Sequence, residues 1–287
     1  MSSLIPLNAV REALHAAIHP EDRLVIVHSG LWAFGHRVDA DPRRLPEAIL
    51  DALLEAVGPQ RTLVLPTFAL DYPRTRTYDV VRTRPQAGIL GERLLARPGA
   101  IRTLKPMYNY AVLGPEKDAI QALRSSDAWG ADSFMGYARR QNARFVALGL
   151  PWSKTCAYYH NAEAELDVPY RYGKRFAGTL LRDGQLVGPC EEVFFVRAMD
   201  ASPEWTYDDV FREFQSRGQV MDRSVGDMSV LSGRLGEVLG TLFDLVEADP
   251  YTLVANRNAV EAWVRTRKDS EMASLAPESR PQAVAAR

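Results

Sequence analysis

The sequence lacks most of the features that mark secreted, membrane-spanning or disulfide-stapled proteins. Only two of its 287 residues are cysteines, Cys156 and Cys190, which are too few for a disulfide framework. No apolar run approaches the roughly 18 residues that a membrane-spanning helix needs, and no signal-like apolar segment stands at the start. We therefore expect a cytoplasmic protein with free thiols and no membrane partner.

An excess of one charge and a metal-binding pattern are also missing. The formal net charge is −1, with Lys and Arg spread along the chain, which argues against nucleic acid as a partner. His15 and His19 form the one HxxxH pair, but no third ligand is evident, so we expect a solvated surface pair and no metal. A protein that acts on a small molecule, as a monomer or a homodimer, fits this composition better.

What the chain does have is an ordinary globular composition, with 46% hydrophobic and 25% charged residues. We expect one domain over residues 1–267, with its core at about 5–200 and a looser C-terminal lobe at 200–267. Residues 268–287 hold few large apolar side chains, and this composition predicts a disordered tail.

Short, nearly continuous apolar runs at 23–28, 61–66 and 144–150 predict strands that are buried on both faces. A helical pattern at 45–57 lies between the first two runs, and this strand, helix, strand order predicts a parallel pair. We therefore expect an α/β protein with three layers and a mixed, largely parallel central sheet. Further helices are expected at 8–18, 88–97, 116–123, 133–141, 207–217, 232–248 and 259–267, a strand at 110–114, and a loop at 69–86.

The pattern after residue 168 changes to that of antiparallel strands. Residues 174–181 and 192–197 alternate as strands do, and Asp183 and Gly184 between them are typical turn residues. We therefore expect a hairpin, which gives the C-terminal portion an antiparallel character.

The stretch 157–163 carries the first candidate for catalysis, His160. If this stretch is helical, Glu163 lies on the same face three residues later and can raise the basicity of the imidazole. A histidine with a carboxylate partner is suited to act as a general base. A structural histidine is the alternative. Cys156, four residues earlier, is a second candidate nucleophile, although a cysteine after an apolar strand is more typical of packing.

Several segments, in this order, resemble the antibiotic N-acetyltransferase family, whose best-known members are the aminoglycoside 3-N-acetyltransferases. The resemblance covers about residues 5–200. The matching segments are LVIVHSGLWAFG (24–35), TLVLPTF (62–68), the region 78–106 with RPQAGILGERLLARPGAIRTLKP, AVLGP (111–115), FVALGLPWSKTCAYYHNAE (145–163) and PYRYGKRFAGTL (169–180).

The resemblance implies an acyltransferase that takes acetyl-CoA or another acyl-CoA as donor and acylates an amino group. It implies that His160 is the general base and that Glu163 is its acidic partner. The positions that match the family's coenzyme-binding loops are His28, Ser29, Gly30, Leu31, Thr67 and Gly88. The first two strands also end at Ser29, Gly30 and Thr67, and α/β sheets collect ligands just beyond such strand ends.

Other residues are expected to bind the coenzyme or the substrate. Arg82 belongs to the basic loop at 69–86 and could meet coenzyme phosphates. The basic and aromatic stretch 169–172 would suit an anionic, nucleotide-linked substrate about as well as ordinary packing. The expected substrate-binding residues are Tyr158, Tyr159, Tyr170, Arg171 and Asp71.

The predicted reaction is direct acyl transfer to the amine of an amino sugar, either an aminoglycoside or a nucleotide-linked amino sugar. The backbone N–H near Gly30 and the hydroxyls of Ser29 and Thr67 are candidate donors to the oxyanion that forms. The chain departs from the family at Lys105 to Asn109 and at Ala157, and these departures leave the amine open. A hydrolase that uses the same histidine and an inactive coenzyme- or sugar-binding homologue are the alternatives.

Overall fold

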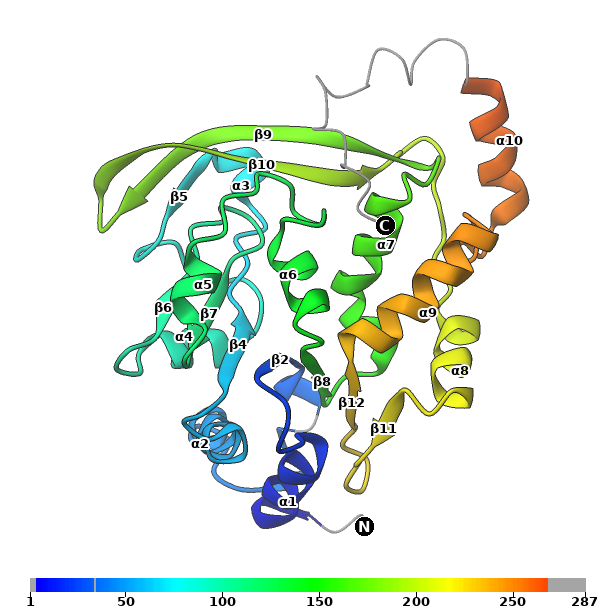
Figure 1. The fold of residues 1–287 in the computed structure, drawn as a ribbon. Coiled ribbons are helices and arrows are strands. Elements are labelled where there is room, and N and C mark those ends of the chain that lie inside the picture. The colour runs from blue at the N-terminus through cyan, green and yellow to red at the C-terminus, as the bar shows by residue number, and fades with distance from the viewer. Residues whose placement is uncertain (1–3, 34, 268–287) are drawn as a thin grey trace.

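A seven-stranded mixed sheet forms the centre of the protein in the computed structural model, which describes residues 4–33 and 35–267 (Figure 1). The strands lie in the order β11-β12-β8-β2-β4-β7-β6. Their bounds are Leu24–Ser29 (β2), Thr62–Pro66 (β4), Ile101–Arg102 (β6), Tyr110–Leu113 (β7), Arg144–Leu148 (β8), Val220–Asp222 (β11) and Val230–Arg234 (β12). The expected tail at 268–287 lies outside the described residues.

The directions of these strands correct one expectation. Strand β2 pairs in parallel with both β4 and β8, as the strand, helix, strand order predicted for the first pair. The pairs β4/β7, β6/β7, β8/β12 and β11/β12 are antiparallel, so the sheet is mixed but not largely parallel. An apolar run reports that both faces of a strand are buried, but it carries no information about the direction of the neighbouring strand.

Helices pack on both faces of the sheet because the side chains of β2 alternate between two hydrophobic clusters. Leu24 and Ile26 belong to one cluster, and Val25 and Val27 to the other. The second cluster includes helices α1 (Leu7–Ala17), α2 (Leu45–Val57) and α4 (Ile89–Leu95). The first includes α6 (Phe134–Arg140), α7 (Tyr159–Glu165) and α9 (Leu235–Ala248).

The remaining elements are short or peripheral. Every helix expected from the apolar periodicity is present within three residues of its predicted ends. The helices not yet named are α3 (Tyr72–Thr75), α5 (Lys117–Gln121), α8 (Asp208–Ser216) and α10 (Arg257–Arg267), and the 3-10 turns are η1 (Leu31–Ala33) and η2 (Trp152–Tyr158). Strand β1 (Ile5–Pro6) pairs with β3 (Val38–Asp39).

The segment expected as a loop at 69–86 contains helix α3 and strand β5 (Thr77–Asp79), so that prediction was wrong. Two buried tyrosines hold the segment in place. The hydroxyl of Tyr72 donates to the carbonyl of Phe176 at 3.3 Å, and that of Tyr78 donates to the carbonyl of Thr103 at 2.8 Å. The segment has no periodicity because these two side chains, rather than an apolar stripe, fix it against the protein.

The predicted hairpin is confirmed and is longer than expected. Strands β9 (Arg171–Arg182) and β10 (Gln185–Arg197) turn at Asp183 and Gly184, whose φ angles of 51° and 81° suit this turn. Strand β5 adds to β9 in parallel and makes a second, three-stranded sheet. This sheet arches over α3, α6 and α7 at the top of Figure 1.

Strand β12 draws residues from the C-terminal third into the main sheet. It pairs with β8 from Val230 opposite Leu148 to Arg234 opposite Arg144. Its apolar signal is weak, because only Val230 and Leu231 precede Ser232 and Gly233. Residues 218–230 were expected to form turns and a short strand, and residues from 232 onward a helix, so a strand at 230–234 was not expected.

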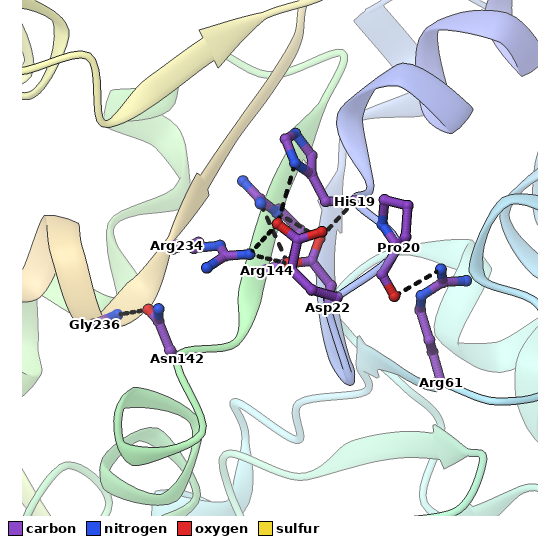
Figure 2. Close-up of polar contacts among 9 residues, drawn as sticks. His19, Pro20, Asp22, Arg61, Asn142, Arg144, Arg234 and Gly236 are labelled. Carbon is purple, nitrogen blue, oxygen red and sulfur yellow. Dashed lines mark hydrogen bonds and ion pairs between the residues drawn. The ribbon is translucent and has the colours of Figure 1, made fainter.

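A buried ion pair lies at the end of the sheet where β2 and β8 begin (Figure 2). The guanidinium of Arg144, at the start of β8, donates to both carboxylate oxygens of Asp22 at 2.8 and 3.2 Å. The side chains are 4% and 1% exposed. Arg234 of β12 reaches the same carboxylate at 3.5 Å, and the backbone N–H of His19 donates to it at 2.7 Å. Asp22 thus links three segments that are distant in the sequence.

Within the ranges that the structure describes, no helix is long and apolar enough to cross a membrane.

Candidate active site

Helix α7 presents His160 beyond the carboxyl end of β8. Tyr158 and Tyr159 are fully buried and fix the start of the helix in the core, with their rings stacked at a centroid distance of 4.6 Å. Asn161 donates to the carbonyl of Trp129, and the Trp129 ring lies edge-on to the imidazole of His160 at 5.2 Å. The helix and the ring together fix the position of the imidazole.

The predicted pair of His160 and Glu163 is formed. Their Nδ1 and Oε2 atoms are 2.6 Å apart. Because an ionised carboxylate only accepts hydrogen bonds, Nδ1 carries the proton and Nε2 is left as the basic nitrogen. The His160 side chain is 17% exposed and that of Glu163 only 1%, so a ligand can reach the histidine but not the carboxylate.

Two further side chains hold Glu163 on its other oxygen. Arg171 Nε lies 2.9 Å from Oε1, and the hydroxyl of Tyr170 donates to the same atom at 3.2 Å. Arg171 also lies over the ring of Trp205, 4.6 Å from its centroid. Arg171 and Tyr170 were expected to bind substrate, but their polar groups support the carboxylate.

These contacts set the charge of the site at neutral pH. Burial and the nearby Arg171 cation lower the pKa of His160, while Glu163 opposes them. Burial alone would raise the pKa of Glu163, but Arg171 and His160 hold it below its usual value. The histidine is therefore neutral and the glutamate ionised at neutral pH, which is the combination that a general base requires.

We expect Arg171→Met to raise the pKa of His160, because it removes a cation that disfavours the imidazolium. The base must be unprotonated to act. The acidic limb of the plot of kcat/KM against pH should bend below pH 6.5 in the parent, and it should move to higher pH in Arg171→Met. Arg175→Met removes a cation from the same strand that pairs with Glu191 instead, and it should leave the limb in place. An unmoved limb in Arg171→Met would contradict the role of Arg171.

His160 opens into a cavity of about 510 Å³ beneath the base of the hairpin. The lining residues come from β9, β10, helix α7, the loop before β7 and the segment before α8. They are Tyr108, His160, Arg171, Tyr172, Lys174, Phe176, Phe194, Val196, Arg197, Met199, Trp205 and Tyr207. Arg171 is the only expected substrate-binding residue among them. Lys174, Arg197 and Trp205 were not expected, although the basic and aromatic stretch 169–172 pointed to this region.

The expected coenzyme residues other than Arg82 lie at or near the carboxyl ends of β2 and β4. A Cβ atom on Gly88 would lie 3.9 Å from Ser29 Oγ, and the Gly88 φ of 75° is one that glycine favours. Burial lowers the pKa of His28 to about 4, so this ring is neutral. In the described part of the chain its Nε2 has no hydrogen-bond partner. A buried polar atom left without a partner fits a ligand at this place.

The three candidate oxyanion donors differ in availability. The hydroxyl of Thr67 donates to Asn109 Oδ1 at 2.8 Å and is fully buried. The backbone N–H of Gly30 donates to the carbonyl of Leu148 at 2.9 Å. Both donors are thus engaged within the protein, and the half-buried Ser29 hydroxyl is left as the stronger candidate.

The remaining expected site residues are not brought to His160. Tyr158 and Tyr159 lie in the core, which argues against direct contact with a substrate. Asp71 lies 3.9 Å from Arg74 at the start of α3 and does not line the cavity. Arg82 binds Asp183 at 2.9 Å at the tip of the hairpin, at the opposite end of β9 from Arg171. Its expected contact with coenzyme phosphates remains a prediction.

The other candidate nucleophile, Cys156, has a side chain that lies outside the described ones. Cys190 is a free thiol, and its Sγ lies 3.4 Å from the Tyr72 hydroxyl. Over residues 4–33 and 35–267, no three His, Cys, Asp or Glu side chains form a group that could hold a metal ion.

A family model described as aminoglycoside 3-N-acetyltransferase matches residues 26–247, most of the chain. The chain belongs to this family. Aminoglycoside N(3)-acetyltransferase VII of Streptomyces paromomycinus is 30% identical over 186 residues, 57% of this chain and 62% of the relative. The corresponding enzyme IX of Micromonospora chalcea is 29% identical over 188 residues, 57% of this chain and 63% of the relative. The chain thus matches less than two thirds of the length of each.

Solved structures of this family share the fold. The apoenzyme of aminoglycoside acetyltransferase AAC(3)-IVa aligns with a TM-score of 0.69 and 18% identity, over 91% of this chain and 98% of the other. AAC-VIa bound to sisomicin aligns with a TM-score of 0.70 and 18% identity, over 86% and 98%. The predicted α/β class and the predicted family are therefore confirmed.

Proposed function

We propose that this protein is an acyl-CoA-dependent N-acyltransferase that transfers an acetyl group to the amine of an amino sugar, with His160 as the general base. The observation that carries the proposal is the hydrogen bond of 2.6 Å between His160 and the buried Glu163. It leaves one basic nitrogen at the wall of an open cavity. Membership of the aminoglycoside 3-N-acetyltransferase family supports the same reaction.

The chemistry follows from what each residue can do. The thioester of the donor supplies the activated acyl group. As the amine nitrogen adds to its carbonyl carbon, His160 Nε2 takes the proton that the nitrogen loses, and the tetrahedral adduct then expels the thiolate of the coenzyme. Glu163 stabilises the imidazolium that forms, and Arg171 keeps Glu163 ionised. The hydroxyl of Ser29 is our candidate donor to the oxyanion.

The donor would enter on the side of the sheet's carboxyl ends. His28 and Ser29 end strand β2 there, and a Cβ atom on Gly88 would lie 3.9 Å from Ser29 Oγ. The acceptor would enter through the cavity beneath the hairpin. We therefore propose a ternary complex, in which the two substrates approach His160 from different sides and no covalent enzyme intermediate forms.

The test is a measurement of coenzyme release from acetyl-CoA with and without amines. We expect release that depends on an amine and yields one N-acetyl product per thiol. Release at a comparable rate without any amine would instead assign a thioester hydrolase. Tight coenzyme binding without turnover on any amine would assign a catalytically inactive binding protein. The identity of the acyl chain, the oligomeric state and the cytoplasmic location stay predictions.

A further inference from the structure

The charge of the His160 cavity narrows the class of acceptor. Three of its lining residues are cations, Arg171, Lys174 and Arg197, and none of the twelve is an Asp or Glu. Glu163 lies behind His160, and both of its oxygens are already engaged. No carboxylate of the lining is therefore available to bind the ammonium groups of a polycationic acceptor.

Two of the three cations have no acidic partner. Arg171 is neutralised by Glu163. Among the ion pairs of the described residues, none involves Lys174 or Arg197, and both side chains are exposed at the cavity. Lys174 Nζ lies over the ring of Phe176, 5.6 Å from its centroid. The cavity thus carries two positive charges that nothing in its lining balances.

The strand register adds an independent observation. Arg197 of β10 lies directly opposite Arg171 of β9. Because Glu163 already pairs with Arg171, the positive charge left at this end of the hairpin is that of the exposed Arg197. An anion bound near Arg197 would balance this charge.

We propose that the acceptor amine carries a phosphate group, bound by Lys174 and Arg197 at the mouth of the cavity while the amine points to His160. This proposal rests on the acyl transfer proposed above. A phosphate carries a charge of roughly −1.5 to −2, which matches two unpaired cations better than a single carboxylate does. The rings of Trp205 and Tyr207 in the same lining offer flat surfaces for the sugar or a base of the acceptor.

A second cavity, of about 390 Å³, does not offer a better place for a polycation. Its lining includes the carboxylates Asp132 and Glu191, but also the cations Lys105 and Arg124, so their charges balance. Tyr108 lines both cavities, and His160 lines only the larger one. An amine in the smaller cavity would have no base of this kind in its lining.

The test compares glucosamine with glucosamine 6-phosphate, which differ only in the phosphate, and with the polycation sisomicin. We expect kcat/KM for the phosphorylated sugar to exceed that for glucosamine by about tenfold or more at low salt, and the ratio to fall as salt is added. Lys174→Glu and Arg197→Glu should each abolish this preference and leave the KM for acetyl-CoA within about twofold. Arg182→Glu makes the same change at the far end of β9 and should leave the preference intact.

Three results would overturn the inference while leaving the acyl transfer in place. The first is a preference for glucosamine over glucosamine 6-phosphate, and the second is a preference for sisomicin. The third is a rise in the KM for acetyl-CoA, and in no other constant, in Lys174→Glu and Arg197→Glu, which would assign the two cations to the coenzyme. Calorimetry gives a readout independent of turnover. Glucosamine 6-phosphate should bind the parent and Arg182→Glu, but not Lys174→Glu. Absence of transfer to every amine would refute the proposed function, and the calorimetric result would still decide whether the cavity selects phosphate.

Discussion

His160→Ala should lower kcat/KM for acyl transfer by about 10²- to 10⁴-fold, the usual contribution of a positioned general base. The imidazole is 17% exposed at the wall of the cavity, and its Nε2 is the free basic nitrogen of the His160 and Glu163 pair. Coenzyme affinity should change by less than about twofold, because none of the expected coenzyme residues lines the His160 cavity. Steady-state kinetics and calorimetry with CoA measure the two quantities separately.

The controls distinguish loss of the base from loss of structure. His15→Ala removes an exposed histidine on α1 and should behave as the parent does. Glu163→Gln keeps a hydrogen-bond acceptor near Nδ1 but removes the charge that stabilises the imidazolium, so its loss of kcat should be smaller than that of His160→Ala. Turnover near the parental rate in His160→Ala would show that another group removes the proton.

Arg144→Met should destabilise the protein by about 3–5 kcal/mol, the typical result of leaving one partner of a buried ion pair uncompensated. Asp22 is 1% exposed, and without Arg144 it keeps only the longer contact to Arg234 and the N–H of His19. The effect should be seen in urea unfolding as a lower midpoint with an unchanged slope. It should not be accompanied by a matching loss of kcat, since the pair lies at the opposite end of the sheet from His160.

Two further variants test the explanation. Arg37→Met breaks an exposed pair with Asp227, whose side chains are 51% and 63% exposed, and should cost less than about 1 kcal/mol. The double variant Asp22→Leu with Arg144→Met removes both charges, and it should be more stable than Arg144→Met alone. If the double variant were the less stable one, the cost would come from lost packing rather than from an unpaired carboxylate.

Local geometry explains which parts of the site were accessible to sequence reasoning. His160 and Glu163 are three residues apart on one helix, so a helical stretch brings them together whatever surrounds it. The helices and the buried strands follow in the same way from the spacing of apolar residues along the chain. The residues at the ends of β2 and β4 could be grouped because parallel neighbours end at the same edge of a sheet.

The rest depends on contacts between segments that are distant in the sequence. The direction of the outer strands depends on the connections between strands, and an apolar run carries no information about these connections. Thr67 was expected to donate to a ligand, but its hydroxyl donates to the side-chain oxygen of Asn109, 42 residues later. Tyr158 and Tyr159 have the residue types of a binding site and instead pack in the core.

The charge of the cavity is the clearest example of a property that depends on such contacts. Arg171 is eight residues from Glu163, beyond a helix end and a turn, so no periodicity relates the two side chains. Lys174 and Arg197 come from two strands of one hairpin, and only the folded hairpin brings both of them into the lining of the cavity at His160. The sequence was enough to place a base and its carboxylate on one helix. The charge that selects the acceptor arises only when β9 and β10 close over that helix.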